Sequence, residues 1–425
     1  MSAYDAIVVG AGPAGAATAA HLARGGARVL ICDPSHFPRD KACGGGLTPR
    51  GVGALDRLGV KLSDDEAIAV GGLEMIGHGR SVATSFPVTS TWPGHGLVSR
   101  RSVLDNAILE AAIDAGAEFR TGVRVTGPLF EDGLCRGVRT KTEGSVEEIE
   151  ADWTIAADGA TSVTARAAGL APSTTSGAGG GFWYAALRGF VGPVTPRTHG
   201  GEPVLEFYPL RTEAGRWLPA YGWVFPLPDG GANIGVDIPH TPKLAACPPL
   251  RLAYDAFVER LRRERPGFED AVAEAPPQGA LLPEAMLGFR AGASGLLAVG
   301  DAAGMITPYS GEGILYALES AEHAARSILG ERRPSETVRL YTAALHDGYA
   351  FQLGSALRIM KAMRKAPPAA AAAAVGLRSE RALRAGVRIM AYLIEEDPAA
   401  TSTVSKGYRL ARRLARRMAH SRSGV

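Results

Sequence analysis

The sequence contains no stretch of apolar residues that approaches the ~20 needed for a helix to cross a bilayer. Its cysteines, Cys32, Cys43, Cys135 and Cys247, lie far apart and form no C-x-x-C pair. This spacing argues against a structural zinc site and is typical of a reducing compartment. No signal peptide is expected, because the first apolar run of strand length already begins at Ala6. We therefore expect a cytoplasmic protein that holds no metal.

The charge of the chain is nearly balanced, and the basic excess lies at one end. The formal net charge is +3, and residues 409–425 carry six arginines and no acidic residue. No other basic cluster indicates a nucleic-acid partner. Within this tail, Leu410, Leu414 and Met418 recur at spacing four, with arginines on the other faces. The pattern fits either a basic helix lying peripherally on the inner face of the cell membrane or a terminal helix docked on the protein.

The most informative segment runs from Asp5 to Asp33. An apolar run of strand length ends in Gly10, Gly12 and Gly15, a G-x-G-x-x-G pattern at the start of an alanine-rich helix. The first glycine permits a tight turn, the second lets the backbone approach a pyrophosphate, and the third lets helix and strand pack closely. Asp33 ends the next strand, where a carboxylate accepts hydrogen bonds from ribose hydroxyls. The segment predicts a dinucleotide site rather than an ordinary glycine-rich turn.

A loop rich in glycine follows the second strand. Its residues 38–46, Pro-Arg-Asp-Lys-Ala-Cys-Gly-Gly-Gly, are called the glycine-cysteine loop below. Loops at this place in a dinucleotide fold return toward the ligand, so we expect its backbone to lie flat against a planar ligand that Cys43 faces. The alternative is a surface loop in which Cys43 is a small packed residue. For Arg39 and Lys41 there are also two alternatives: they hold the ligand or the loop, or they are solvated charges.

Two later segments are placed to meet the first. Asp158 directly follows a predicted strand, and Gly300-Asp301 stands between another strand and a helix. Asp301 can accept hydrogen bonds from ribityl hydroxyls. The helix predicted from Gly311 can aim its N–H groups at the pyrimidine edge of a flavin and stabilise the anionic reduced form. The order and spacing of the three segments, more than any one of them, indicate a flavin dinucleotide.

Residues 171–282 have a different pattern, because short β-type runs alternate with Pro and Gly turns. Tyr221, Trp223 and Phe225 alternate along one of these runs, so their side chains share one face of a strand. That face either walls an apolar slot or fills the core of a domain.

At this point the chain resembles the FAD enzymes with a glutathione-reductase-like FAD domain. The glycine-cysteine loop looks like the signature of the geranylgeranyl reductase family, and residues 221–226 look like its Y-x-W-x-F-P signature. Residues 308–313, Pro-Tyr-Ser-Gly-Glu-Gly, are similar to its P-x-x-G-E-G turn. Residues 218–221 and 388–390 are similar to those of members that saturate one isoprene unit of menaquinone.

The resemblance implies a fold of α/β + β class. It consists of a glutathione-reductase-like, FAD-binding Rossmann domain, an inserted antiparallel-sheet substrate domain and C-terminal helices. The expected FAD-binding domain comprises residues 1–75, 98–170 and 285–334, the substrate domain 76–97 and 171–284, and the C-terminal helical region 335–425.

The resemblance also implies an activity and a site. NADPH or another reductant reduces FAD, hydride then passes to one carbon of an isoprenoid double bond, and a proton reaches the other. The chain has no second G-x-G-x-x-G, so a nicotinamide donor binds transiently. The expected catalytic residues are Cys43, as candidate proton donor, with Gly44, Gly45, Tyr221 and Trp223. The expected FAD-binding residues are Gly10, Gly12, Pro13, Ala14, Gly15, Asp33, Arg39, Lys41, Ala42, Gly46, Arg101, Asp158, Gly300, Asp301, Pro308, Gly311, Gly313 and Ile314.

Two other functions stay open. A flavin-dependent monooxygenase or halogenase would use the same fold, although only fragments of the halogenase G-W-x-W-x-I-P stretch occur here. A prenyl-binding carrier that has lost its flavin is disfavoured by the three intact flavin segments. The sequence leaves open which double bond is reduced, which donor acts and which oligomer forms.

Overall fold

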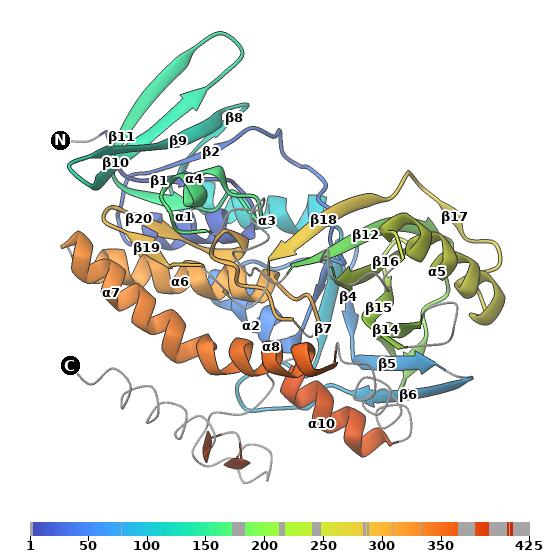
Figure 1. Cartoon of the computed structure of the whole chain (residues 1–425). Coiled ribbons are helices and arrows are strands. Elements are labelled where there is room, and N and C mark those ends of the chain that lie inside the picture. The colour runs from blue at the N-terminus through green and yellow to red at the C-terminus, as the bar shows by residue number, and fades with distance from the viewer. Residues whose placement is uncertain are drawn as a thin grey trace.

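The structure is a computed structural model in which two large sheets lie side by side (Figure 1). It describes residues 3–77, 79–171, 183–211, 217–239, 248–283, 286, 289–308, 310–331, 333–363, 379–390, 406–407 and 409–410. Cys247 and Tyr309 lie outside these residues, as does most of the arginine-rich tail.

The first sheet has eight strands, and its central path β20-β11-β1-β2-β8 is parallel throughout. Apolar side chains fill β1 and β2 almost without interruption, as expected for parallel strands covered on both faces. The hairpin of β9 and β10 extends from β11, and β19 pairs with β20 at the edge. The bounds are β1 (Tyr4–Val9), β2 (Val29–Asp33), β8 (Glu118–Thr121), β9 (Arg124–Glu131), β10 (Leu134–Lys141), β11 (Val146–Ala156), β19 (Gly292–Ala293) and β20 (Leu296–Ala298).

Helices pack against this sheet and form the largest core with it. Small residues dominate the buried face of α1 (Pro13–Arg24), which lets α3 (Arg101–Asp114) and α6 (Ile314–Gly330) approach it closely. A short helix, α4 (Val163–Ala167), follows β11, and a 3-10 turn, η1 (Gly300–Ala303), follows β20. The carboxyl ends of β1 and β20 thereby lead directly into α1 and η1, as the glycine patterns predict.

The second sheet has nine strands and includes the run of alternating aromatics. Its path is β17-β12-β16-β15-β14-β5-β6, with β13 beside β14 and β18 beside β12. Helix α5 (Leu250–Glu264) covers one face with Tyr254, Phe257 and Leu261. The bounds are β5 (Gly72–Gly77), β6 (Arg80–Ser85), β12 (Trp183–Gly192), β13 (Thr198–His199), β14 (Glu202–Arg211), β15 (Trp217–Pro226), β16 (Ala232–Pro239), β17 (Val272–Ala273) and β18 (Gln278–Pro283).

One pairing in this sheet departs from the expected antiparallel pattern. β5 runs parallel to β14, with Gly72 opposite Val204 and Met75 opposite Phe207. The whole of β5 is therefore part of the nine-stranded sheet, and the domain boundary expected after residue 75 falls inside a strand. A parallel neighbour from a distant segment leaves no turn signal in the sequence.

A small third sheet and the C-terminal helices complete the fold. β3 (Gly46–Leu47), β7 (Gly96–Ser99) and β4 (Ala67–Val70) pair around the end of the glycine-cysteine loop, next to α2 (Pro49–Leu58). Further along the described part of the chain come α7 (Pro334–Leu345), a π-helical turn η2 (His346–Ala350), α8 (Phe351–Met363) and α10 (Glu380–Met390). No helix among the described residues is both long and apolar enough to span a membrane.

Helix α10 lies against the nine-stranded sheet near β6 (Figure 1). Its Leu383 and Val387 are buried in one apolar cluster with Trp223 and Phe225 of β15. The side chains of residues 388–390 are outside the described part of the chain, as are residues 411–425 of the expected basic helix.

Candidate active site

A continuous pocket of about 710 Å³ is lined by residues of both large sheets. It gathers the glycine turn after β1, the glycine-cysteine loop, the turn before α6 and the aromatic face of β15. All but three of the expected site residues line it. The lining members are Gly10, Gly12, Pro13, Ala14, Asp33, Arg39, Lys41, Ala42, Cys43, Gly44, Gly45, Gly46, Arg101, Asp158, Tyr221, Trp223, Asp301, Gly311, Gly313 and Ile314. Gly15, Gly300 and Pro308 are not among the lining residues.

The glycines of the first turn differ in what requires them. Gly10 has φ +101°, and a Cβ there would lie 2.6 Å from the carbonyl oxygen of Ala157. A Cβ on Gly15 would lie 1.9 Å from the carbonyl oxygen of Gly10, so this glycine serves helix packing rather than the pocket. Gly12 is different, because its backbone is ordinary and a Cβ would meet only the Arg39 guanidinium at 3.5 Å. The space in front of Gly12 is therefore free for a ligand.

Two expected cofactor carboxylates also hold the protein's own backbone. Asp33 accepts hydrogen bonds from the N–H of Ala11 and of Ser35, each at 2.8 Å. Asp158 accepts from the Ser162 hydroxyl and from the N–H of Thr164, and so caps the start of α4. Both carboxylates shape the pocket wall, and their direct contacts to a cofactor stay predictions.

Arg39 and Arg101 share one buried carboxylate at the pocket. Asp105 accepts from Nε and Nη2 of Arg101, both at 2.6 Å, and from Nη1 of Arg39 at 2.8 Å. Burial alone would lower the pKa of Arg101, but the charge of Asp105 outweighs it and the pKa is raised. Two guanidinium groups on one carboxylate leave a net positive charge beside Gly12, which favours an anionic ligand there.

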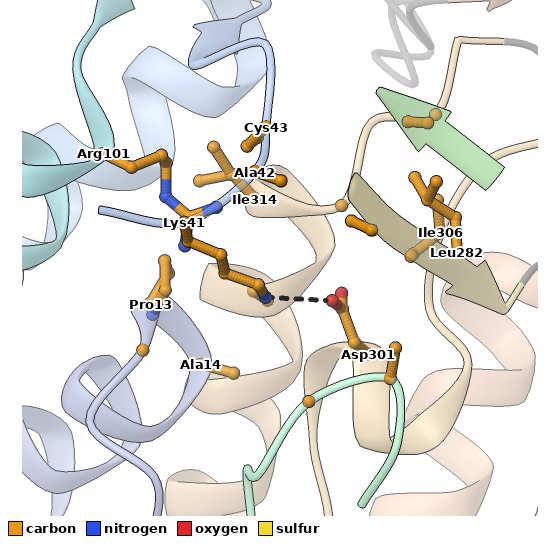
Figure 2. A pocket seen from close by; sticks show the side chains of 18 of the residues that line it. Pro13, Ala14, Lys41, Ala42, Cys43, Arg101, Leu282, Asp301, Ile306 and Ile314 are labelled. Carbon is orange, nitrogen blue, oxygen red and sulfur yellow. Dashed lines mark hydrogen bonds and ion pairs between the residues drawn. The ribbon is translucent and has the colours of Figure 1, made fainter. Parts of the chain in front are cut away.

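An ion pair crosses the pocket between distant segments. Nζ of Lys41 lies 3.4 Å from Oδ2 of Asp301, and Figure 2 shows the two side chains reaching toward each other. Asp301 is held there by η1, which lies close to α1. Gly300 makes this approach possible, since a Cβ there would lie 2.8 Å from Cβ of Ala14. Gly300 therefore acts through packing, which explains its absence from the pocket lining.

The glycine-cysteine loop is anchored to the nine-stranded sheet. Asn233 in β16 donates from Nδ2 to the carbonyl of Cys43 at 2.8 Å and accepts from Nε1 of Trp223 at 3.0 Å. A Cβ on Gly44 would lie 2.9 Å from the Phe225 ring. Gly45, with φ +69°, packs on the carbonyl of Ser99, where a Cβ would lie at 2.2 Å. These glycines are needed for close protein packing, and contact of their backbone with a planar ligand stays a prediction.

Cys43 itself is half-buried and reaches the pocket near Arg101 (Figure 2). Its Sγ accepts a weak hydrogen bond from the N–H of Gly45 at 3.4 Å. The thiol also contributes to the raised pKa of Arg101, after burial and Asp105. The side chain is thus accessible from the pocket and also held by its own loop.

The aromatic side chains of β15 share one face, as predicted. Ring centroids of Tyr221 and Trp223, and of Trp223 and Phe225, are 6.2 Å apart. Phe207 of β14 joins them at 5.5 Å from Tyr221 and 5.4 Å from Phe225. All four line the pocket, and Trp223 and Phe225 are buried in an apolar cluster against which Phe207 and Tyr221 pack. The same side chains therefore wall the pocket and fill the core beside it, so the two alternatives drawn from the sequence do not exclude each other.

Two carboxyl groups in the pocket were missed. Oε1 of Glu312 accepts from the hydroxyl of Thr48 at 2.8 Å, whereas Oε2 has no partner among the described residues, and burial raises the pKa to about 7. Asp237 in β16 lies opposite Tyr221, and burial raises its pKa well above the ordinary value. The G-E-G pattern contained the signal for Glu312. Asp237 had no signal, because it stands in a strand with every residue buried.

The comparisons with known proteins agree with this geometry. Residues 3–186 match the model of an FAD binding domain family. A menaquinone reductase from Mycolicibacterium smegmatis is 35% identical over 93% of this chain and 93% of its own length. Digeranylgeranylglycerophospholipid reductase 2 from Methanothermobacter thermautotrophicus is 32% identical over 76% of each chain.

The chain belongs to the geranylgeranyl reductase family of FAD-dependent oxidoreductases.

Solved structures place this reductase in a wider fold. A geranylgeranyl bacteriochlorophyll reductase-like protein from Thermoplasma acidophilum has a TM-score of 0.72 at 20% identity, covering 96% of this chain and 99% of its own. The flavin-dependent brominase Bmp2 also has a TM-score of 0.72, at 16% identity, covering 97% and 99%. Both likenesses describe the fold alone. Reductases and halogenases share it, so the distinction between them depends on sequence relatives and site residues.

The pocket of this reductase fits FAD at two helix ends. Gly12 and Gly313 are the N-caps of α1 and α6, and both line the pocket. Neither helix has a capping side-chain hydrogen bond or an acidic residue in its first turn, so no side chain of the helix start competes with a ligand for the first N–H groups. α6 begins at Ile314 rather than at Gly311, whose φ of +63° is outside helical geometry. A pyrophosphate at α1 and a pyrimidine edge at α6 would satisfy both ends.

Proposed function

We propose that this reductase saturates a carbon–carbon double bond in an isoprenoid chain, most specifically a menaquinone-type prenyl chain. The observation that carries the proposal is the adjacency of two surfaces. The aromatic face of Phe207, Tyr221 and Trp223 lines the same pocket as the glycine-cysteine loop and the FAD segments. An apolar chain lying on this face would reach the cofactor directly. The names of the relatives supply the substrate class, as menaquinone in one case and a geranylgeranyl lipid in the other.

FAD, when bound and reduced, supplies hydride. The chain's own residues have three tasks. Arg39 and the start of α1 bind the pyrophosphate, and Gly313 with Ile314 at the start of α6 holds the ring edge. The aromatic face orients the prenyl chain and excludes water. Each ordered methylene adds roughly 0.8 kcal/mol of burial, so distant parts of the chain help to hold the target bond in place.

The electron donor belongs to the same proposal. We infer that NADPH, or another reductant, binds transiently and leaves after reducing FAD. The chain contains one G-x-G-x-x-G, at Gly10–Gly15, and FAD would occupy it. Anaerobic bleaching of the flavin absorbance by NADPH and by NADH, measured separately, identifies the donor.

Peripheral membrane contact through the arginine-rich tail is a further part of the proposal. Six arginines without an acidic residue in 409–425 would be attracted to anionic lipid headgroups. Removing residues 409–425 should lower recovery on anionic vesicles and leave the reduction of a detergent-solubilised substrate unchanged. Equal recovery of both forms on the vesicles would show that the tail docks elsewhere.

The deciding experiment is anaerobic. Reduced, FAD-loaded enzyme is incubated with a prenyl quinone, and mass spectrometry looks for the gain of two hydrogens per reduced double bond. A prenyl quinone that stays unchanged, together with oxygenation or halogenation of an aromatic compound in air, would establish the monooxygenase or halogenase alternative. A purified protein that is colourless and binds no added FAD would instead favour the carrier.

A further inference from the structure

Asp237 is a buried acid inside the pocket that the proposed function has not used. It stands in the middle of the nine-stranded sheet, directly opposite Tyr221 in the β15–β16 register. Its exposed fraction is 3%, yet it lines the pocket together with the aromatic face. A carboxyl group buried this deeply needs hydrogen-bond partners to offset the loss of water.

The hydrogen bond of the Tyr221 hydroxyl bears on the protonation state of Asp237. The Tyr221 hydroxyl donates to the carbonyl oxygen of Ser310 at 2.6 Å, and a carbonyl can only accept. A phenol has a single proton, so while this bond exists the hydroxyl does not donate to Asp237, which lies opposite Tyr221 in the register. Tyr221 by itself would lower the pKa of Asp237, but burial outweighs this effect. Both observations favour a protonated Asp237.

The surroundings of Asp237 support the same protonation state. β12 places Ala186 opposite it on the other side, and the loop before α6 approaches it with Gly311. Among the titratable groups of the described residues, only Tyr221 acts on it, and no cation compensates a negative charge there. Burial thus raises the pKa of Asp237 well above its ordinary value. The group holds its proton in neutral solution, in the way that apolar active sites keep carboxylic acids neutral.

One oxygen of this carboxyl is left without a partner. Oδ1 of Asp237 is buried and unbonded among the described residues, so the contact to Tyr221 falls to Oδ2. An unsatisfied buried polar atom costs roughly 1–3 kcal/mol, and such atoms in native proteins call for an explanation. The pocket that Asp237 lines offers one, because a bound substrate would fill the space beside it.

We propose that Asp237 is the acid that protonates the substrate double bond. This inference rests on the proposed function. The O–H bond of Asp237 breaks, and a C–H bond forms at the less substituted alkene carbon. The other carbon becomes tertiary and cationic, and it receives the hydride of the reduced flavin, which leaves the flavin oxidised. Asp237 then regains a proton from water as the product departs.

The pocket contains the groups that this reaction order requires. An isolated alkene is a poor hydride acceptor, and protonation makes it a good one. Asp237 is a carboxyl group that keeps its proton at the pocket, and a positioned acid of this kind is what the step needs. The aromatic side chains of Tyr221, Trp223 and Phe207 line the same space, and their π-systems can stabilise positive charge on the substrate.

Tyr221 can stabilise Asp237 after the proton leaves. Its hydroxyl can turn from the carbonyl of Ser310 to the new carboxylate of Asp237 and donate to it. A charge-assisted bond of this kind is stronger than the neutral one it replaces, and it favours proton release at the moment the substrate becomes cationic.

The test compares the wild type with Asp237→Asn, which keeps the shape and an N–H donor for Tyr221. Infrared spectroscopy of the protein without substrate should show a protonated-carboxyl carbonyl band at neutral pH that Asp237→Asn lacks. Glu312→Gln, which removes the other pocket carboxyl with a raised pKa, should keep this band. With FAD bound in equal amount, Asp237→Asn should reduce the prenyl substrate slower by about 10²-fold or more. In deuterated water the wild type should place deuterium at the less substituted carbon.

The outcomes distinguish a failure of the proposed function from a failure of the role assigned to Asp237. A wild type that does not reduce prenyl substrates contradicts the proposed function. A wild type that does, together with an Asp237→Asn that turns over at the same rate, overturns the assignment of the acid. A missing carboxyl band in the wild type overturns it as well, whatever the activity. Asp237→Glu, which restores a carboxylic acid, should recover part of the lost rate if the group acts as an acid.

Discussion

Arg188 in β12 donates from Nη2 to both carboxylate oxygens of Asp40, at 2.8 and 2.7 Å. The same nitrogen lies 3.0 Å from the carbonyl oxygen of Lys41. Arg188 is almost fully buried, at 3% exposure, and stacks on the ring of Phe190. A single guanidinium thus fastens the glycine-cysteine loop to a sheet 148 residues further along the chain.

Arg188→Met should loosen this loop while leaving the sheets intact. The change strips Asp40 of a charge-assisted partner, and we expect a loss of about 1.5–3 kcal/mol in unfolding free energy. Amide hydrogen exchange in residues 38–46 should accelerate, and prenyl reduction should slow. Arg251→Met is the matched control, because Arg251 pairs with Asp255 on the exposed face of α5. Its stability should change by less than about 0.5 kcal/mol. Unchanged exchange in Arg188→Met would mean that other contacts suffice to hold the loop.

Gly12→Val and Gly10→Val should fail in different ways. A side chain on Gly12 meets little in the protein, so the fold should survive while the pyrophosphate loses its place. A side chain on Gly10 would overlap the carbonyl of Ala157 at a positive φ, so this variant should be destabilised by about 1–3 kcal/mol or more. The ratio of flavin to protein absorbance and the unfolding temperature without FAD distinguish the two. A yellow Gly12→Val would contradict the assignment of the pyrophosphate to this turn.

Cys43→Ala should keep its FAD spectrum and slow prenyl reduction by less than about 10²-fold, the lower range for loss of a general acid. The thiol lies at the pocket and supports its own loop through the N–H of Gly45. Its removal alters the shape of the site without removing the acid assigned to Asp237. Steady-state rates of both variants at equal FAD occupancy make the comparison. A larger loss in Cys43→Ala than in Asp237→Asn would return the proton to the thiol.

Glu312 should make the stability of the protein depend on pH between about 4.5 and 7. Burial raises its pKa from 4.5 to about 7, so in this interval the folded state keeps a proton that the unfolded state releases. The free energy of unfolding is therefore highest below this interval. It falls by about 3 kcal/mol as the pH rises through the interval, and then it levels off.

Glu312→Gln removes this titration, so the two proteins should be similar near pH 4.5 and the variant more stable above pH 7. Urea denaturation of both proteins across this pH range measures the difference. Parallel curves would contradict a protonated Glu312. Oε1 of Glu312 accepts from Thr48 in either case, so Thr48→Val serves to separate the loss of that hydrogen bond from the titration.

The sequence was most informative where the chemistry is local. The β1–α1–β2 unit follows from a strand-length run, a glycine pattern and an acid within about 30 residues, and the shared face of Tyr221, Trp223 and Phe225 follows from strand alternation. These features depend on neighbours along the chain, which a sequence displays directly. The expected helix start at Gly311 was wrong by three residues, because a left-handed glycine and a helical glycine look alike in sequence.

The contacts that the sequence could not supply join residues of different elements. Asn233 lies 190 residues from the carbonyl it holds at Cys43. Asp237 becomes a partner of Tyr221 only through the register of β15 and β16, and a shift of one residue would turn it to the other face. Strand order and register are long-range properties. The sequence of a single chain does not show which strands pair or in which register.

Three neighbouring glycines would give a free loop a large conformational entropy. In the folded protein the glycine-cysteine loop keeps little of this entropy, because it is held at three points. Asp40 is fixed by Arg188, the carbonyl of Cys43 by Asn233, and the carbonyl of Gly45 by the N–H of Ser99 at 3.1 Å. That freedom is lost when the chain folds, so it is not lost a second time when a ligand arrives. Cofactor binding to this wall should accordingly proceed without the unfavourable entropy of ordering a mobile segment.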